Sequence, residues 1–294
     1  MAKRNFFIRE SELDDYQINV MQSRVNKSSI VKGCAGSGKS ILALHKVKQI
    51  QEQNIGSFYF ILFTKALKQY MSDGIADIGL ENDRVTYHYA WKWKKVDGQK
   101  VLNAPAADYI IVDEAQDFSE EDIRLFQSKA NKALVLFGDS AQQIYAFRNP
   151  PPISMEQIAV LTGIQSMDLV FNHRLPKKIA RLAEAISDSD DDLVIKCRNE
   201  GVVMPKVLKF LSLANQLDKI IEIVTNRQFD DVGILFRSNK DVQNAKMYFD
   251  QKGFTVEANI AFSPTVINFN NSKPKLLTYH SSKGLQFEAV FIPN

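Results

Sequence analysis

Residues 28–40 read "SSIVKGCAGSGKS": a short apolar segment, a glycine-rich turn, and the start of a stretch with helical periodicity. From Gly33 to Ser40 the residues fit the pattern G-x-x-x-x-G-K-[ST] between a predicted strand and a predicted helix. Glycines let backbone N–H groups curl round a phosphate, and the helix N-terminus adds a favourable dipole. The sequence therefore predicts a phosphate-binding loop made of Gly33, Cys34, Ala35, Gly36, Ser37, Gly38, Lys39 and Ser40.

A second stretch, "YIIVDEAQD" at 109–117, specifies the chemistry of this loop further. Here an apolar strand runs into Asp113 and Glu114. An Asp at a strand end can hold Mg²⁺ together with Ser40, and the adjacent carboxylate can orient or deprotonate an attacking water while Lys39 contacts the β and γ phosphates. Two acidic residues after a strand can also be a helix N-terminal cap. Because these two acidic residues follow the phosphate loop by about 75 residues, we favour the catalytic interpretation.

Short apolar segments alternate with helix-like segments along the whole chain. The predicted strands lie near residues 30, 60, 111, 135, 234 and 291, and the predicted helices span 39–53, 119–130, 177–187, 212–226 and 239–252. Strands that are apolar on both faces and alternate with helices are typical of parallel sheets covered on both sides. The predicted fold class is therefore α/β. The acidic run at 187–192 and "NFNNSKP" at 268–274 are expected to be loops.

Composition narrows the class of protein without assigning a partner. The chain has 294 residues, 45% hydrophobic and 24% charged, and its formal net charge is +3. This charge neither supports nor excludes a polyanionic partner. The two cysteines, Cys34 and Cys197, do not suggest a disulfide framework or a zinc site. No apolar run approaches the roughly 20 residues that span a bilayer, so we expect no membrane partner and a cytoplasmic location.

Seven segments, in order along the chain, resemble the motifs of superfamily one helicases of the UvrD, Rep and PcrA kind. Their second motif is typically Asp-Glu-[Ala/Phe]-Gln-Asp, as at 113–117 here. The other similar segments are Tyr16-Gln17, "ILFTKAL" at 61–67, "VTYH" at 85–88, "FGDSAQQIYAFR" at 137–148, "FNHRLPKKIA" at 171–180 and "TYHSSKGLQF" at 278–287. The resemblance covers residues 17–287 and implies two RecA-like P-loop NTPase domains with parallel sheets flanked by helices.

For the nucleotide, ATP with Mg²⁺, the resemblance implies roles beyond the phosphate loop. Gln17 would bond the adenine edge, Gln142 would sense the γ-phosphate, and Arg174 would act as an arginine finger from the second domain. His173 stands where the family usually has a Tyr that stacks on adenine, and Gln286 replaces a Glu that binds the ribose. The first departure predicts weaker base packing and a less sharp preference for ATP, and the second predicts a hydrogen bond to the ribose without charge assistance.

For single-stranded DNA or RNA, the resemblance and the residue types agree. Strands are held by basic grooves and aromatic faces. The candidates are Thr64, Lys65, His88, Tyr145, Phe147, Arg148, Thr278, His280 and Lys283. "YHYAWKWKK" at 87–95 interleaves aromatics and lysines in the same way, although Trp91 and Trp93 can equally be core or lid residues, and His88 can be a packing residue. Phe147 is the better stacking candidate.

Domain boundaries and absent segments qualify this interpretation. Three successive prolines at 150–152 suggest a seam, from which we expect a first domain over 1–160 and a second over 161–294. The gaps between residues 88 and 113 and between 239 and 278 are too short for the accessory insertions of full-size relatives. Motif VI, whose Arg also contacts the γ-phosphate, is not in the sequence. We expect this chain to bind ATP better than it hydrolyses it.

Two functions of different class stay open. The first is an ATP-dependent DNA helicase or translocase core, with ATP hydrolysis coupled to single-stranded DNA binding and movement. The second is a nucleotide-dependent DNA-binding switch or regulatory subunit, which acts through a protein partner that completes or regulates the motor. A small-molecule P-loop kinase would not explain the segments from 137 to 287.

Overall fold

The computed structural model describes residues 10–80, 83–145, 147–187, 192–258 and 267–294. Within them the chain forms two compact units, each described here by itself. The larger unit contains residues 10–63 and 73–206, and the smaller unit contains residues 64–72 and 207–294. Of the helices in the described part of the chain, none combines the length and the apolar character needed to cross a membrane.

The larger unit is built on a parallel sheet. Within the described residues this sheet has six strands in the order β3-β2-β6-β7-β1-β8, and all five pairings are parallel. The strands are β1 (Ser29–Gly33), β2 (Phe58–Leu62), β3 (Val85–Tyr87), β6 (Ala107–Val112), β7 (Ala130–Gly138) and β8 (Ser166–Leu169). The carboxyl ends of parallel strands meet at one edge, which is where such sheets bind ligands.

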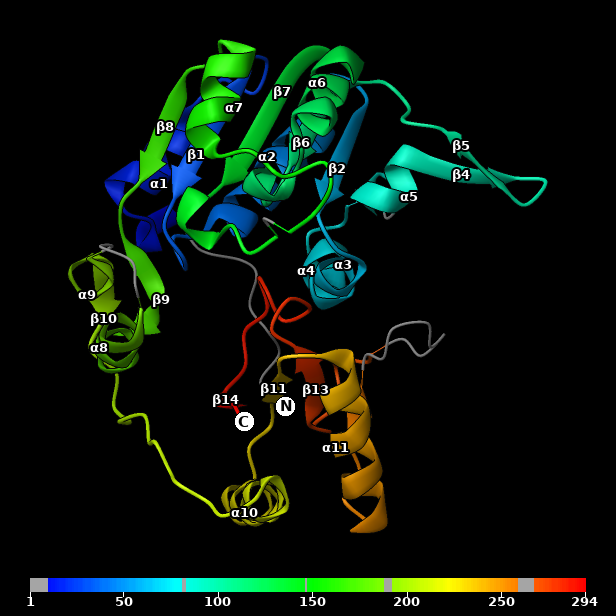
Figure 1. Cartoon of the computed structure of the whole chain (residues 1–294). Helices are drawn as coiled ribbons and strands as arrows, with labels where there is room; N and C mark the ends of the chain where they lie inside the picture. The colour runs from blue at the N-terminus through cyan, green and yellow to red at the C-terminus, as the bar shows by residue number, and fades with distance from the viewer. Residues whose placement is uncertain (1–9, 81–82, 146, 188–191, 259–266) are drawn as a thin grey trace. The chain divides into compact units, whose positions relative to one another are not determined.

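Helices cover both faces of this sheet, α6 and α7 on one and α2 on the other (Figure 1). The helices of the unit are α1 (Asp15–Gln22), α2 (Lys39–Glu52), α4 (Ser72–Asp77), α5 (His88–Lys92), α6 (Glu120–Lys129), α7 (Met155–Thr162), α8 (Lys177–Ile186) and α9 (Leu193–Lys196). Ile123 and Phe126 of α6 and Ile158 of α7 are fully buried in the core. The N-terminus of α6 is capped by Ser119, whose side chain accepts a hydrogen bond from the Asp122 amide.

Two smaller pairs of strands complete the larger unit. The antiparallel hairpin of β4 (Trp93–Val96) and β5 (Gln99–Leu102) extends away from the sheet (Figure 1). The parallel pair of β9 (Asn172–Pro176) and β10 (Cys197–Asn199) follows β8. Short 3-10 turns lie at Glu10–Glu12, Ala115–Asp117 and Ser140–Gln142.

The smaller unit has a second parallel sheet, in which the described strands are ordered β12-β13-β11-β14. Its elements are α3 (Lys65–Tyr70), α10 (Leu213–Arg227), β11 (Val232–Phe236), α11 (Asn239–Gln251), β12 (Glu257–Ala258), β13 (Lys275–Thr278) and β14 (Ala289–Phe291). Its core joins Leu217 and Ile220 of α10 to Phe249 of α11 and Ile234 of β11. Ordered alternation of strands and helices confirms the α/β class in both units.

The units divide at residues 206 and 207, whereas the sequence placed a boundary after residue 160. The difference arises because β8 pairs with β1 and so belongs to the first sheet. The assignment of two RecA-like domains stays a prediction. Residues 268–274 form a loop as expected, while residues 188–191 of the acidic run lie outside the described residues.

Candidate functional site

The phosphate loop lies between the end of β1 and the start of α2. Gly36 and Gly38 have φ angles of +69° and +88°, which L residues with side chains rarely adopt. The Lys39 ammonium donates hydrogen bonds to the carbonyl oxygens of Gly33 and Cys34, at 2.8 and 3.0 Å, so its side chain lies back across the loop. The Ser37 hydroxyl is buried and has no hydrogen-bond partner among the described residues. These features fit a loop whose polar groups are completed by bound phosphate.

The segment after β8 packs directly on this loop. The amide of His173 donates to the carbonyl oxygen of Gly36 at 3.0 Å. A Cβ atom on Gly36 would lie only 2.2 Å from Asn172 Oδ1 and 2.7 Å from Arg174 Cβ. Asn172 is fully buried, and its Oδ1 accepts hydrogen bonds from the amides of Arg174 and Leu175 at 2.9 and 2.8 Å. The structure therefore brings Arg174 next to the phosphate loop, within the larger unit.

Ser40 and Asp113 meet at the carboxyl ends of β1 and β6. The Ser40 hydroxyl donates to Asp113 Oδ2 at 2.5 Å, and the Glu114 amide donates to Asp113 Oδ1 at 3.0 Å. Burial, and then the neighbouring Glu114 carboxylate, raise the pKa of Asp113 to about 6. The described residues contain no group of three His, Cys, Asp or Glu side chains placed to hold a metal ion. A Mg²⁺ ion here would take oxygen ligands from Ser40 and Asp113 and complete its coordination with phosphate or water oxygens.

Glu114 has an unusual backbone and a tightly held carboxylate. Its φ and ψ angles, +56° and +43°, are left-handed, a conformation that costs about 1–3 kcal/mol for a residue with a side chain. Its side chain is 5% exposed, and Oε2 accepts a hydrogen bond from Gln116 Nε2 at 2.6 Å. Strained residues of this kind cluster at functional sites.

Hydrogen bonds continue from Gln116 to the end of β7. Gln116 Oε1 accepts from the Asp139 amide at 2.9 Å, and Asp139 Oδ2 accepts from Gln142 Nε2 at 2.7 Å. The Gln116 carbonyl oxygen also accepts from Gln143 Nε2 at 3.0 Å. Burial raises the pKa of Asp139. Glu114 and Gln142, both expected from the sequence, are therefore joined through two residues that the sequence did not single out.

Gln17 belongs to the cap of α1 and also contacts the phosphate loop. Its Oε1 accepts from the Asp14 amide at 3.1 Å, and its Nε2 donates to the Ser37 carbonyl oxygen at 3.0 Å. Asp14 Oδ2 in turn lies 2.7 Å from His173 Nε2. Gln17 and His173 are thus both beside the phosphate loop, on opposite ends of one chain of contacts through Asp14. Their roles toward a base stay predictions.

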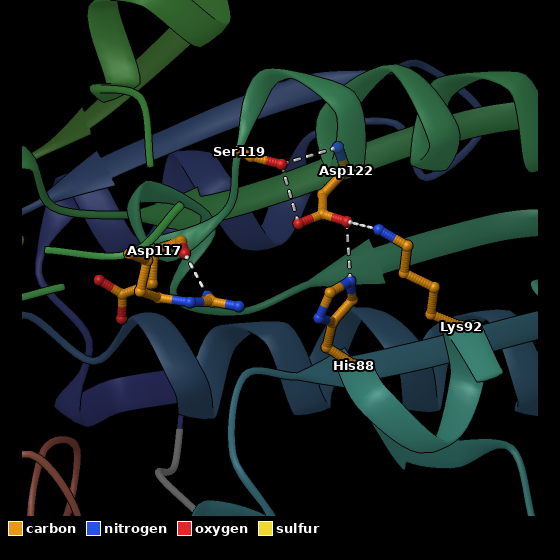
Figure 2. A network of polar contacts seen from close by, with 6 residues as sticks. His88, Lys92, Asp117, Ser119 and Asp122 are labelled. Atoms are coloured by element: carbon orange, nitrogen blue, oxygen red, sulfur yellow. Dashed lines mark hydrogen bonds and ion pairs between the residues drawn. The ribbon is translucent and has the colours of Figure 1, made fainter. Parts of the chain in front are cut away.

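Asp122 organises a second polar cluster, shown in Figure 2. Its Oδ1 lies 2.5 Å from Lys92 Nζ and 3.0 Å from His88 Nε2, and its Oδ2 accepts from the Ser119 hydroxyl at 3.1 Å. Burial favours the protonated acid, but the hydrogen bonds and charges of His88 and Lys92 hold the pKa of Asp122 well below its ordinary value. His88 is buried and packs edge-on against Phe118, with ring centroids 4.8 Å apart.

A cavity of about 230 Å³ lies beside this cluster. Its lining is mainly aromatic and charged. The lining residues are Phe63, His88, Tyr89, Lys92, Trp93, Ser119, Glu121, Asp122, Arg148 and Pro150. Arg148 lies over the Phe63 ring, 5.1 Å from its centroid, and donates to the Asp117 carbonyl oxygen at 3.2 Å. Phe147 is 72% exposed, whereas Tyr145 is buried and burial, then the charges of Asp117 and Glu114, raise its pKa.

Of the two tryptophans left open by the sequence, Trp91 is a core residue. It is 2% exposed and lies 5.1 Å from Phe126 between ring centroids. Trp93 is half-buried, begins β4, and lines the cavity. The interleaved run at 87–95 therefore contains one side chain for the core and one for the cavity.

The other predicted residues lie in the smaller unit. Thr64 caps α3, its hydroxyl accepting from the Leu67 amide at 3.1 Å, and Lys65 is exposed. Thr278 is buried at the end of β13, and its hydroxyl accepts from the Ser281 amide at 3.1 Å. His280 and Lys283 are half-buried in the turn that follows, and Gln286 is exposed. All of these residues belong to the same compact unit.

Four functional candidates were missed by the sequence analysis: Gln116, Asp139, Asn172 and Asp122. Gln116 and Asp139 stand inside the quoted segments at 109–117 and 137–148, so the signal was present but their partners were not. Asp122 is 34 residues from His88, and nothing in the sequence links them.

Comparison with known proteins gives a family match for part of the chain. Residues 17–148, a little under half of it, match the family model described as an AAA domain. A Mycoplasma pneumoniae protein described as a probable DNA helicase is 28% identical over 202 residues, 63% of this chain and 35% of that protein. A protein of Acanthamoeba polyphaga mimivirus described as a "putative ATP-dependent DNA helicase" is 24% identical over 213 residues, 63% of this chain and 28% of its own length. The chain spans about a third of these relatives.

Comparison with solved structures gives distant matches to two helicases. The PRRSV helicase has a TM-score of 0.37 at 14% identity, covering 92% of this chain and 56% of its own. The arterivirus nonstructural protein 10 helicase, solved in complex with DNA, has a TM-score of 0.37 at 14% identity and covers 91% of this chain and 65% of its own. The site is assigned from the geometry of this chain alone.

Proposed function

We propose that this chain is the ATP-hydrolysing core of a DNA helicase or translocase, in which nucleotide turnover is coupled to binding of single-stranded DNA. One observation carries the proposal. The loop that follows β6 holds Asp113 and Glu114 beside the phosphate loop, and three residues later its Asp117 carbonyl oxygen accepts the hydrogen bond from Arg148 at the cavity. One short segment therefore contacts both candidate sites.

On the nucleotide side, each residue has a definable task. The phosphate loop and Lys39 would bind the phosphates of ATP, Ser40 and Asp113 would hold Mg²⁺ with a phosphate oxygen, and Arg174 would add positive charge from β9. The bound metal nucleotide supplies the transferable phosphoryl group and its charge neutralisation. Glu114 would orient and deprotonate a water, since its carboxylate is held in place by Gln116.

Coupling between the sites needs an element that both ligands bias. Gln116 is suited to this task, because it bonds the Glu114 carboxylate with its amide nitrogen and the Asp139 amide with its oxygen. Its carbonyl oxygen bonds Gln143, two residues before Tyr145. A shift of Glu114 toward a nucleotide would thus disturb the segment that carries Tyr145, Phe147 and Arg148.

On the strand side, the cavity offers rings and cations in the combination that holds unpaired bases and phosphates. Phe63, Tyr89 and Trp93 supply aromatic surface, and Arg148 supplies charge. Exposed Phe147 adds a further ring. In the smaller unit, Thr64, Lys65, Thr278, His280 and Lys283 are proposed to bind the strand's backbone, and Gln286 the ribose of the nucleotide.

The relatives support the same assignment, since both are described as DNA helicases and align over 63% of this chain. Their names specify DNA, and this favours DNA over RNA. Because the chain spans about a third of their length, movement along a strand and unwinding of a duplex are parts of the proposal.

The test compares phosphate release by the purified protein with and without a single-stranded oligonucleotide. We expect the oligonucleotide to stimulate release, and Glu114→Gln to abolish the stimulated rate while ATP binding is retained. Glu52→Gln, at an exposed ion pair with Lys48, is the matched control and should behave like the parent protein. An unchanged stimulated rate in Glu114→Gln contradicts the assignment of the base. ATP and strand binding without turnover would instead favour the nucleotide-dependent switch.

A further inference from the structure

The β4–β5 hairpin carries an arrangement of lysines that its own stability does not explain. In its register Lys95 stands directly opposite Lys100, and Lys94 opposite Val101. All residues from Lys94 to Leu102 are exposed. Like charges opposite each other across an antiparallel pair are destabilising, and an isolated two-stranded hairpin is marginally stable in water.

The hairpin lysines form no ion pair with any described residue, although Asp97 stands in the turn between β4 and β5. Among the residues that the structure describes, no ion pair includes Lys94, Lys95 or Lys100. Lys92, one residue before β4, does have such a partner, because its ammonium lies 2.5 Å from Asp122. The charge of Lys92 is therefore neutralised locally, whereas the three hairpin lysines outnumber Asp97 and leave residues 93–102 with a net charge of +2 for an external anion.

The root of the hairpin is fixed to the core. The Asn103 amide donates to the Lys92 carbonyl oxygen at 2.8 Å, and the Ala104 amide donates to the Trp91 carbonyl oxygen at 3.0 Å. Trp91 and Ala104 both belong to the buried core cluster of the larger unit. The hairpin thus presents its lysines in a defined direction, which lowers the entropic cost of binding a partner.

The same root opens on the aromatic cavity. Tyr89 and Trp93 line that cavity, and each ring has a lysine over it. Lys100 Nζ lies 4.9 Å from the Tyr89 ring centroid, and Lys92 Nζ lies 5.6 Å from that of Trp93. Rings and lysines are therefore continuous from the cavity to the hairpin.

We propose that the β4–β5 hairpin binds the phosphate backbone of a single-stranded nucleic acid where the strand extends beyond the cavity, through Lys94, Lys95 and Lys100. This inference rests on the proposed function, because the cavity is the strand site to which the hairpin adds. The partner is a polyanion because the three lysines form no ion pair with the described residues and exceed the single acidic residue of the hairpin, Asp97. It is single-stranded because the rings at the hairpin root stack on unpaired bases. The contact is independent of sequence, since lysines bind phosphate as point charges.

The experiment measures the affinity of the full chain for single-stranded oligonucleotides of about 6 and about 20 nucleotides, lengths around the usual site sizes, over a range of salt. The test variant carries Lys94→Gln, Lys95→Gln and Lys100→Gln. The control variant carries Lys27→Gln, Lys206→Gln and Lys209→Gln, which removes three exposed charges elsewhere. Melting followed by circular dichroism checks that both variants fold.

Because the test variant cannot neutralise three phosphates of the longer strand, the slope of log K against log salt for that strand should fall by about 2, and its affinity roughly 10- to 50-fold at about 0.15 M salt. The shorter strand and the control variant should change little. An unchanged slope in the test variant, an equal loss of affinity in the control, or a loss confined to duplex DNA overturns the hairpin assignment while the proposed function stands. If the parent protein binds no strand at all, the proposed function itself fails, and the hairpin assignment fails with it.

Discussion

Replacement of Asp122 by Asn tests the polar cluster that joins α5 to α6. The Asp122 side chain is 6% exposed and contacts Lys92, His88 and Ser119 (Figure 2). Asn keeps the shape of the side chain and one oxygen that can still accept hydrogen bonds from Lys92 and His88, but it removes the negative charge. Lys92, whose side chain is 18% exposed, is then left with a largely buried charge that has no carboxylate beside it.

The magnitude follows from the two charged contacts. A hydrogen bond to a charged group contributes about 1.5–3 kcal/mol, and a neutral one about 0.5–1.5 kcal/mol. Exchanging two of the former for the latter lowers the free energy of unfolding by roughly 2–4 kcal/mol. In a unit of this size, each kcal/mol lowers the melting temperature by about 2–4 °C. We therefore expect a decrease of roughly 5–15 °C.

Tryptophan fluorescence can follow this unit alone, because the chain has two tryptophans and both, Trp91 and Trp93, lie in the larger unit. The pH dependence gives an independent signature. The pKa of Asp122 is lowered in the folded state, so its contribution is present in full above the unfolded value of about 3.9 and is lost as pH falls below that value toward the folded one. The difference between the parent protein and the variant should therefore shrink below about pH 4.

Glu121→Gln, an exposed charge on the same helix, is the control and should melt within about 2 °C of the parent. A melting temperature of Asp122→Asn as high as that of the control would refute the reasoning. So would a difference that stays constant from pH 7 to pH 3, since it would then not come from the carboxylate charge.

Three further changes test other parts of the site. Gly36→Ala should lower ATP affinity at least about tenfold in a binding titration, because the new Cβ would lie 2.2 Å from Asn172 Oδ1 at a φ of +69°. The control is Gly79→Ala, where φ is +68° but no atom lies within 4 Å of the new Cβ. This control should bind ATP normally in the same titration. Burial lowers the pKa of Lys46 in the folded state to about 8, so between about pH 8 and 10.5 the unfolded chain binds more protons than the folded one. In urea unfolding, the parent should therefore gain stability relative to Lys46→Met as pH rises through that window. A difference in unfolding free energy that stays constant with pH contradicts this. Phe147→Ala should leave the melting temperature unchanged, since the residue is 72% exposed, but it should weaken strand binding by about 1–3 kcal/mol. If the variant and the parent bind the strand with equal affinity in a fluorescence titration, stacking on this ring is excluded.

Secondary structure was predictable wherever local pattern and capping agreed. The helix expected over 239–252 is α11, Asn239–Gln251, which begins at a Ser238 capping box. The buried run expected near 111 is β6, whose last four residues are all buried. In both places a single segment contains its own boundary signals, so no distant partner is needed to place it.

The site was predictable in its motifs but not in its connections. Ser40 and Asp113 could be expected to meet, because both follow parallel strands and the carboxyl ends of such strands share an edge. The contact between Gly36 and Asn172 depends on how the chain turns after β8, and no local pattern specifies that turn. The roles of Trp91 and Trp93 in the run at 87–95 stayed open for a related reason: its alternation of rings and lysines is divided between α5 and β4, which place the two rings differently.

The left-handed backbone of Glu114 has an evolutionary consequence. The conformation favours Gly and Asn over Glu, so the chain keeps a strained residue at this position for as long as a carboxylate is useful there. Under the proposed role of Glu114 as the base, a descendant that bound ATP but no longer hydrolysed it would lose the benefit of the carboxylate and keep the strain. Drift toward Gly or Asn at position 114 is then the expected course, and the residue found there in diverged relatives records whether hydrolysis was retained.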